Sequence, residues 1–367
     1  MTTNLDGYPK KIAIVISGLT QGGAEYSICN LLPYIDEANI ITIICLQNFD
    51  KEIELPRTRN YNLIRLEAKK LIDLSSFLRL KRILKNHEYI FAHLIWAQYW
   101  SGLMCVLDKS FREKTIWFEH NLYLDRKFLH WKILKFLGLY IKNVIAVSEE
   151  VSSYFTINTK IKTKVLPNPI SVPKHLTGTA RFEGKIVDIA VYGRLVNQKN
   201  PFLAVDSFLE LHRLKNIKYS PRLNIIGSGQ LKAKLCDYCS TNPDIIFYEF
   251  PKKHLALQKL SECQIFLSTS RFEGFPLARF EALRLGLCVV STKTAGLKFL
   301  LDFYRSEKYM REIGIFFVNE DLTEISQALK TLANKRFWRQ DYIDQRVSCT
   351  KQLSPKNISL KLLQELE

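Results

Sequence analysis

The stretch from Phe266 to Gly286, FLSTSRFEGFPLARFEALRLG, contains a strand, a loop and a helix in immediate succession. An apolar run that ends near Ser268 predicts a buried strand, and a helical pattern begins at about Leu277. Pro276 is typical of the opening of a helix, and Gly274 lets the backbone approach a ligand closely. Because a helix N-terminus carries free N–H groups and about half a positive charge, this turn suits a phosphate or an anionic sugar compound.

Two glutamates belong to this unit: Glu273 in the loop and Glu281 one turn into the helix. A carboxylate accepts hydrogen bonds from two vicinal hydroxyls, which makes Glu281 a candidate ligand of a ribose. The alternative is an ordinary strand–turn–helix unit that carries two surface glutamates.

The alternation of strands and helices extends along the rest of the chain. In the first half, the pattern predicts strands over 11–17, 40–46, 89–94, 115–118 and 144–147, and helices over 26–35, 71–84 and 126–142. A second series predicts strands over 186–192, 222–226, 245–247, 264–268, 288–291 and 315–318, with helices over 201–214, 230–239, 277–285, 322–334 and from about 358. Such alternation predicts the α/β class, with parallel sheets covered by helices on both faces.

A break in this pattern divides the chain. Residues 165–173, VLPNPISVP, contain three prolines and are followed by polar and glycine-containing sequence. We therefore place a boundary between an N-terminal domain, 1–172, and a second domain, 173–349. Ligands of doubly wound sheets bind beyond the carboxyl ends of the strands, so two facing Rossmann-like domains predict a ligand in the cleft between them.

The chain of 367 residues has 53 Lys and Arg against 36 Asp and Glu, a net charge of +17. This excess is spread over both halves and favours anionic partners. Nucleic acid is not expected, because no zinc-finger, zipper or RNA-recognition signature is present. The sequence has no signal-peptide core and no apolar run of about 18 residues, so we expect a cytoplasmic protein whose membrane contact is peripheral at most. The one CxxC pair, Cys236 and Cys239, is interpreted as two helix-face thiols.

Two cations follow the first strand of the second domain. Arg194 and Lys199 lie in GRLVNQK, residues 193–199, at the edge of the sheet where anions usually bind. An arginine fork and a lysine point charge would stabilise the charge of a departing nucleoside diphosphate. Two solvated basic residues on a basic protein are the alternative.

The first domain contributes two weaker candidates. The loop SGLTQGGAE contains Gly18, Gly22 and Gly23, whose backbone N–H groups could face an anion, although it matches neither the dinucleotide nor the Walker motif. His120, in WFEHN just past a strand, could bond sugar hydroxyls or transfer a proton; a structural histidine is the alternative.

Taken in order, these motifs resemble the retaining glycosyltransferases of family 4, which have the GT-B fold. The matching segments are GGAE, His120, VSEEV (147–151), LPNPI (166–170), GRLVNQK (193–199), IIGSG (225–229) and EGFPLARFE (273–281). The last segment matches the E-x₇-E motif of that family. Cys288 and Asn200 depart from the family pattern, where proline and glycine are common, and both are expected to be packing positions.

The resemblance implies a role for each matching residue. Glu273 would contact the donor sugar, Arg194 and Lys199 would hold the diphosphate, Glu281 would bind the ribose, and His120 would face the sugar and acceptor. The remaining donor-binding positions would be Gly22, Gly23, Gly227, Phe250, Lys252, Gly274, Phe275, Pro276 and Leu277. The resemblance also implies that a C-terminal helix, about 350–367, packs back on the first domain.

The implied reaction moves a hexose or N-acetylhexosamine from a nucleotide sugar, with a UDP-sugar as the expected donor, to a hydroxyl of a growing saccharide with retention. No metal is expected, because no DxD pair accompanies the donor motifs and protein cations take its place. The alternatives are a nucleotide-sugar epimerase of the same architecture and a non-catalytic homologue.

The expected acceptor is a lipid-linked or cell-surface saccharide, as in lipopolysaccharide or capsule biosynthesis. Residues 126–142, RKFLHWKILKFLGLYIK, are basic, aromatic and helix-periodic, so they could lie on the anionic cytoplasmic face of the inner membrane. A domain helix with its apolar face on the sheet explains the same pattern.

Overall fold

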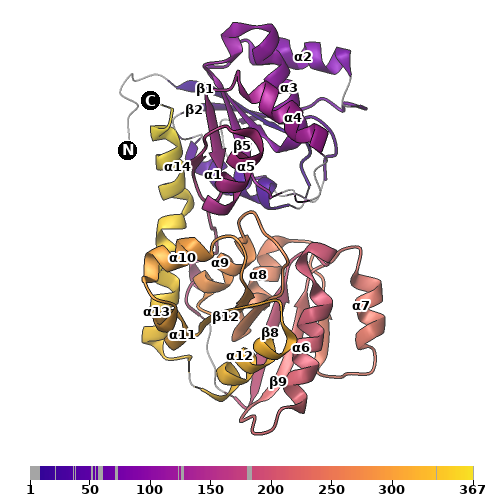
Figure 1. Cartoon of the computed structure of the whole chain (residues 1–367), viewed down its shortest axis with the longest axis vertical. Coiled ribbons are helices and arrows are strands. Elements are labelled where there is room, and N and C mark those ends of the chain that lie inside the picture. The colour runs from indigo at the N-terminus through magenta and orange to yellow at the C-terminus, as the bar shows by residue number, and fades with distance from the viewer. Residues whose placement is uncertain are drawn as a thin grey trace. The chain divides into compact units, whose positions relative to one another are not determined.

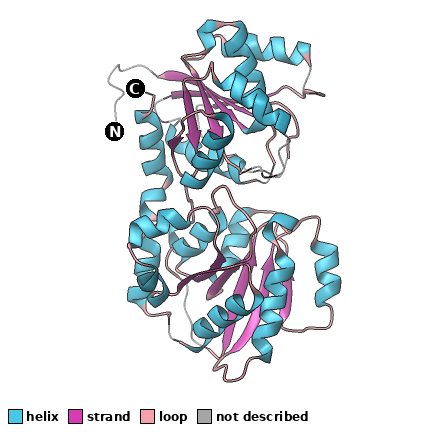
Figure 2. Ribbon diagram, in the orientation of Figure 1, coloured by secondary structure: helices cyan, strands magenta, loops and turns pink. Residues whose placement is uncertain are grey.

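The computed structural model describes residues 9–366 apart from short gaps at 21, 36, 38, 51–52, 54, 57–60, 71–72, 123, 125–127, 180–183 and 336. The chain forms two compact units. Unit 1 comprises the described residues up to Pro169 together with those from Ser354 on, and unit 2 comprises Ile170–Leu353. Figures 1 and 2 show that each unit contains one sheet with helices against it.

Unit 1 is built on a seven-stranded parallel sheet of order β3-β2-β1-β4-β5-β6-β7. Its strands are β1 (Lys10–Ile16), β2 (Asn39–Cys45), β3 (Tyr61–Arg65), β4 (Tyr89–His93), β5 (Thr115–Glu119), β6 (Asn143–Ala146) and β7 (Lys164–Val165). Its helices are α1 (Gly23–Ile35), α2 (Leu74–Leu84), α3 (Leu94–Leu107), α4 (Phe128–Gly138), α5 (Glu149–Thr159) and α14 (Pro355–Gln364), with a 3-10 turn, η1, at Lys109–Phe111. The strand order reverses between β1 and β4, which places the topological switch point at their carboxyl ends.

Unit 2 is built on a six-stranded parallel sheet of order β10-β9-β8-β11-β12-β13. Its strands are β8 (Ile186–Tyr192), β9 (Ser220–Ile226), β10 (Ile245–Tyr248), β11 (Ile265–Ser268), β12 (Cys288–Thr292) and β13 (Ile315–Val318). Its helices are α6 (Pro201–Arg213), α7 (Lys232–Cys239), α8 (Lys253–Ser261), α9 (Leu277–Leu285), α10 (Leu297–Tyr304), α11 (Glu307–Glu312), α12 (Leu322–Asn334) and α13 (Gln340–Ser348), with 3-10 turns at Lys174–Leu176, Asn197–Lys199 and Lys351–Leu353. Here the switch point lies between β8 and β11. The predicted class, two doubly wound parallel sheets in tandem, is confirmed.

The sequence pattern missed helix α3, which follows β4 without an intervening residue. The strand predicted over 89–94 ends at His93, because Leu94 has a φ of 68° and begins the helix. Most residues of α3 are apolar, and the helix is buried around most of its circumference. A helix of this kind shows no clear 3.6-residue alternation.

Two predicted helices differ from the structure at their ends. The segment predicted over 126–142 is helical over Phe128–Gly138, and the segment predicted over 71–84 is helical over Leu74–Leu84. Residues 71, 72, 126 and 127 lie outside the described residues. Asp73 caps α2, because its carboxylate accepts a hydrogen bond from the backbone N–H of Ser76 at 3.1 Å.

The C-terminal helix begins earlier than its apolar periodicity indicates. Ser354 caps α14, Pro355 occupies its first turn, and the helix packs against α1 in unit 1. Two further contacts hold its end: Lys164 pairs with Glu365, and the Tyr89 hydroxyl donates to the Leu366 carbonyl at 2.7 Å. Among the described residues, no helix is both long and apolar enough to cross a membrane.

Close backbone approach at the carboxyl ends of β8 and β9 requires a glycine at position 227. Gly227 has a φ of 151°, and its N–H donates to the Tyr248 carbonyl at 2.8 Å. A Cβ atom at this position would lie 2.0 Å from the Gly193 carbonyl oxygen. The two loops therefore pack at a spacing that leaves no room for a side chain.

We expect Gly227→Ala to destabilise the protein by about 2–4 kcal/mol, because it adds a backbone clash to an unfavourable φ. Urea denaturation followed by circular dichroism measures this change. Gly184→Ala is the control, since its Cβ would have a single neighbour, at 3.9 Å, and it should change the free energy of unfolding by less than about 0.5 kcal/mol. Equal stabilities of the two variants would contradict the packing described.

Candidate functional site

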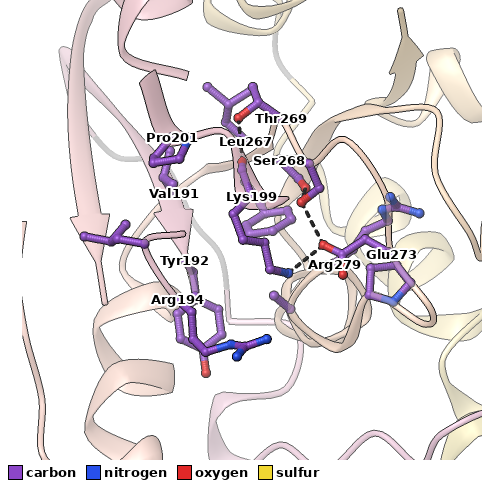
Figure 3. Close-up of a pocket in the computed structure, with 16 residues that line it drawn as sticks. Val191, Tyr192, Arg194, Lys199, Pro201, Leu267, Ser268, Thr269, Glu273 and Arg279 are labelled. Atoms are coloured by element: carbon purple, nitrogen blue, oxygen red, sulfur yellow. Dashed lines mark hydrogen bonds and ion pairs between the residues drawn. The ribbon is translucent and has the colours of Figure 1, made fainter. Parts of the chain in front are cut away.

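A pocket lies in unit 2 at the carboxyl ends of β8 and β11, on the switch point of the sheet (Figure 3). The loop after β8 contributes Arg194 and Lys199 to its lining. The loop after β11 contributes Glu273, and the turn into α9 contributes Pro276. The structure thus brings together the residues of two separate sequence motifs, 193–199 and 273–281.

The central contact in this pocket joins Lys199 to Glu273. The Lys199 Nζ atom lies 2.5 Å from Glu273 Oε1 (Figure 3). The Ser270 hydroxyl donates to the same oxygen at 2.7 Å. Glu273 is only 6% exposed. Burial by itself would raise the pKa of Glu273, but the charge of Lys199, hydrogen bonds from Lys199 and Ser270, and the charge of Arg279 together lower it below its usual value. The carboxylate is therefore ionised at neutral pH.

Hydrogen bonds hold together the two loops that carry this pair. The Thr269 hydroxyl donates to the Asn200 carbonyl at 2.8 Å, and the backbone N–H of Arg271 donates to the Gln198 carbonyl at 2.9 Å. The Gln198 amide nitrogen donates in turn to the Phe272 carbonyl at 2.9 Å. Asn200 has a φ of 47°, a left-handed conformation that asparagine tolerates better than most residues. This explains how asparagine stands where glycine was expected.

Arg279 is a pocket residue that the sequence analysis missed. It is fully buried in α9, and its guanidinium donates to the Ala295 carbonyl at 3.0 Å and to the Thr294 hydroxyl. The guanidinium also lies 4.9 Å from the centre of the Phe317 ring. Arg279 therefore fixes the loop after β12 against α9. The signal that pointed to it was an arginine two residues before Glu281 in the helical run LARFEAL, whose other residues are apolar.

The turn between Glu273 and α9 offers a ligand fewer free backbone N–H groups than the four predicted positions, 274–277, would supply. Pro276 has no N–H group, and the N–H of Leu277 donates to the Phe275 carbonyl at 2.9 Å. The Phe275 ring is buried and stacks on Phe280 with centroids 4.7 Å apart. The backbone amides of Gly274 and Phe275 are therefore the better candidates to face a phosphate or sugar.

Glu281 does not line this pocket. It lies in α9, is 2% exposed, and pairs with Lys253, whose Nζ is 2.6 Å from Glu281 Oε1. The predicted base-binding residues lie in the loops after β9 and β10. Phe250 is half-buried and stacks on Tyr248 at 6.1 Å, while Lys252 is exposed at the start of α8.

In unit 1, His120 lies directly after β5 and pairs with a residue that the sequence analysis did not identify. Its Nε2 is 2.9 Å from the Nδ1 of His93, the last residue of β4, and the His93 ring stacks on Phe118 at 4.3 Å. Both histidines are buried. Burial lowers the pKa of His120 to about 4 and, together with the neighbouring His120, lowers the pKa of His93 well below its usual value. Both rings are therefore neutral at pH 7.

The glycine loop of unit 1 carries its own carboxylate. Helix α1 begins at Gly23, and the buried Glu25 accepts a hydrogen bond from the Thr20 hydroxyl at 2.9 Å. A Cβ atom at Gly22 would lie 2.4 Å from Glu25 Oε2. In this structure Gly22 thus makes room for Glu25 at the helix N-terminus, where an external anion was expected. Among the described residues, no cluster of three or more His, Cys, Asp or Glu side chains could hold a metal ion.

Two family models match the chain in succession. Residues 21–173 match "Glycosyltransferase Family 4", and residues 179–346 match "Glycosyl transferases group 1". The chain is also similar to MJ1059, an uncharacterized glycosyltransferase of Methanocaldococcus jannaschii, with 30% identity over 175 residues. That match covers 43% of this chain and 41% of the relative, so it spans less than half the length of either protein.

Solved structures share the fold over nearly the whole chain. The crystal structure of Anabaena HepE in complex with UDP-glucose superposes with a TM-score of 0.73 at 13% identity, covering 97% of this chain and 99% of HepE. Sucrose-phosphate synthase of Thermosynechococcus elongatus superposes with a TM-score of 0.76 at 14% identity, covering 97% and 98% of the two chains. At such low identity these likenesses show the fold alone.

The buried pair in unit 1 predicts a pH-dependent stability. As the pH falls below about 6.5 the unfolded His120 binds a proton, whereas the folded one stays neutral until about pH 4. Acid therefore lowers the free energy of unfolding. Between pH 7 and 4.5, His120 accounts for a loss of about 2–3 kcal/mol. We expect His120→Asn to lose less stability than the wild type over this range.

Tryptophan fluorescence during urea denaturation measures this difference, since Trp96, Trp100, Trp117 and Trp131 lie in unit 1 and only Trp338 lies in unit 2. Identical pH dependence in the two proteins would contradict a neutral, buried His120.

Proposed function

The chain belongs to glycosyltransferase family 4, a family of retaining enzymes that transfer a sugar from a nucleotide donor, and we propose that its own donor is a UDP-sugar. The transferred group would be a hexose or N-acetylhexosamine, and the acceptor a hydroxyl of a growing saccharide. The UDP-glucose complex of HepE, a protein with the same fold, supports the choice of donor.

The observation that carries this proposal is the cluster of Arg194, Lys199 and Glu273 around one pocket at the switch point of unit 2. A nucleoside diphosphate that leaves carries two to three negative charges, and fixed cations stabilise them as they develop. Lys199 already lies against one anion, the Glu273 carboxylate. In the donor complex we expect it to lie between that carboxylate and the diphosphate.

The proposed reaction retains the configuration at the anomeric carbon. The acceptor oxygen forms a bond to this carbon as the bond to the diphosphate oxygen breaks, and the acceptor proton passes to the departing diphosphate on the same face. Glu273 does not need to form a covalent intermediate. Its role is to contact the donor sugar as an ionised carboxylate, which the lowered pKa of Glu273 keeps available at neutral pH.

His120 is assigned a polar contact to the sugar or acceptor rather than a base. Its pKa of about 4 leaves the imidazole neutral at pH 7, and an imidazole of such low basicity is a weak proton acceptor. Because Nε2 is hydrogen-bonded to His93, the contact with a hydroxyl falls to Nδ1, which donates or accepts according to the tautomer. Gly22 and Gly23 remain proposed donor contacts from the same unit.

We expect Arg194→Ala, Lys199→Ala and Glu273→Ala each to lower the transfer rate by roughly 10²–10³, because each removes a charge that acts on the leaving group or sugar. Release of UDP from a panel of UDP-sugars, with and without saccharide acceptors, measures the rate. Lys215→Ala, at an exposed position outside the pocket, is the control and should keep full activity.

Near-normal rates in all three variants would refute the assignment of the pocket. The same assay separates the alternatives: an epimerase converts the donor without any acceptor and releases no UDP, and a non-catalytic homologue leaves the donor intact.

We further propose that the acceptor is lipid-linked and that unit 1 meets it at an anionic membrane surface. Five apolar side chains of α4 and the residue after it are 36–72% exposed: Phe128, Leu129, Ile133, Phe136 and Leu139. Helix α3 packs beside α4 (Figure 1). It adds the exposed Leu103 and Leu107. We call these seven side chains the apolar helix face.

The charge around the apolar helix face supports a lipid partner. Lys132 and Lys135 are exposed on α4, and neither α3 nor α4 contains an Asp or Glu. Partly buried aromatic and aliphatic side chains interleaved with lysines are typical of helices that lie in the interface of an anionic bilayer. Each lysine near such a surface contributes about 1 kcal/mol.

Flotation with vesicles of phosphatidylglycerol and phosphatidylcholine tests this contact. We expect salt-sensitive binding by the wild type, and at least a tenfold loss in a Phe128→Ser/Phe136→Ser variant, because each exposed phenylalanine would bury apolar area in the bilayer. Phe303→Ser, which changes an exposed aromatic residue of unit 2, is the control and should bind normally. Absence of wild-type binding at low salt would refute the membrane contact.

A further inference from the structure

The two glutamates of the E-x₇-E motif are each paired with a lysine from a different element of unit 2. Glu273 pairs with Lys199, which follows β8, and Glu281 pairs with Lys253, the first residue of α8. The first pair belongs to the pocket described above. The second pair lies outside it and joins α8 to α9, which pack against each other.

The Lys253–Glu281 pair differs from an ordinary surface ion pair. The side chains are 18% and 2% exposed, and Nζ lies 2.6 Å from Oε1. Another ion pair of α8, between Lys259 and Glu262, has a glutamate that is 57% exposed. Surface pairs of the second kind contribute little, whereas removing the cation from a buried pair leaves an uncompensated charge. Removing Lys253 would therefore leave the buried Glu281 side chain without its paired cation.

A buried carboxylate paired with one lysine can still accept further hydrogen bonds. When ionised it only accepts hydrogen bonds, and its two oxygens offer about four acceptor sites, so one lysine does not exhaust them. When protonated it becomes a donor on one oxygen and loses the symmetry that suits two neighbouring hydroxyls. The lysine beside Oε1 fixes the orientation of the group.

We propose that Lys253 is the positioning residue of the ribose subsite: it orients Glu281 so that the carboxylate accepts hydrogen bonds from the two vicinal hydroxyls of the donor ribose. This inference rests on the proposed function, which assigns the ribose to Glu281. Lys253 acts through Glu281 and is given no contact with the diphosphate.

In this role Lys253 affects only the part of the nucleotide affinity that comes from the ribose hydroxyls. A nucleotide without these hydroxyls gains nothing from an oriented Glu281, so its affinity should not depend on Lys253. A lysine that served the phosphates or only the packing of α8 would affect nucleotides with and without the hydroxyls alike.

Isothermal titration with UDP and with 2′,3′-dideoxy-UDP separates these roles without requiring the acceptor. We expect Lys253→Met to weaken the binding of UDP by roughly tenfold or more, the usual range for a hydrogen bond to a charged group, and to change the binding of the dideoxy compound by less than about threefold. Lys253→Arg, which keeps the cation, should retain most of the affinity for UDP.

Lys259→Met is the matched control, since it removes a lysine of similar exposure from the same helix, and it should bind both nucleotides as the wild type does. The double variant Lys253→Met/Glu281→Gln should bind UDP no more weakly than Glu281→Gln alone, because the two residues act as one unit. Thermal unfolding of each variant checks that it is folded.

Equal losses for UDP and the dideoxy compound in folded Lys253→Met would overturn the inference and leave the donor assignment standing. Additive losses in the double variant would overturn it as well. A wild-type protein that binds neither nucleotide would instead contradict the UDP-sugar donor, and the inference with it.

Discussion

The contact between Lys199 and Glu273 is the constraint on which the arrangement of unit 2 depends. A carboxylate that is 6% exposed needs a cation within ion-pair distance, and that cation must come from a neighbouring element. Parallel strands supply this geometry, because β8 and β11 are adjacent and their carboxyl ends meet at one edge of the sheet. The loops that follow them are bonded to each other through Gln198 and Thr269, which fixes the pair in place.

The same requirement recurs around α9. Arg279 brings a buried positive charge to the pocket and anchors the loop after β12, while Glu281 places a buried negative charge two residues further on and is paired with Lys253 of α8. Buried charges of this kind are weak evidence for stability, since apolar side chains would often serve as well. We explain them instead as fixed charges that act on an anionic ligand. Preorganised charges of this kind usually make the largest single contribution to catalysis.

The fold class could be predicted from the sequence because each buried strand and each amphipathic helix has its own period. That Lys199 and Glu273 serve one donor site could also be expected, because both follow strands of one predicted parallel sheet. Their direct ion pair was not predicted. Lys253 and His93 could not be assigned, because each gains its role from a partner on another element and neither lies in a recognised motif. Arg279 lies within the E-x₇-E segment, but its contact with the loop after β12 could not be predicted from the sequence. Helix α3 was missed for a related reason: it is buried on most sides and has no polar stripe to reveal its period.

The central claim is that the pocket at β8 and β11 binds the donor nucleotide. Hydrogen–deuterium exchange, followed by mass spectrometry with and without saturating UDP-glucose, tests this claim most directly because it locates the ligand without an acceptor. Our account predicts slower exchange in peptides that cover residues 193–200 and 269–281, the two loops that carry the fixed charges. Unchanged exchange in both segments, with protection elsewhere in the chain, would contradict it.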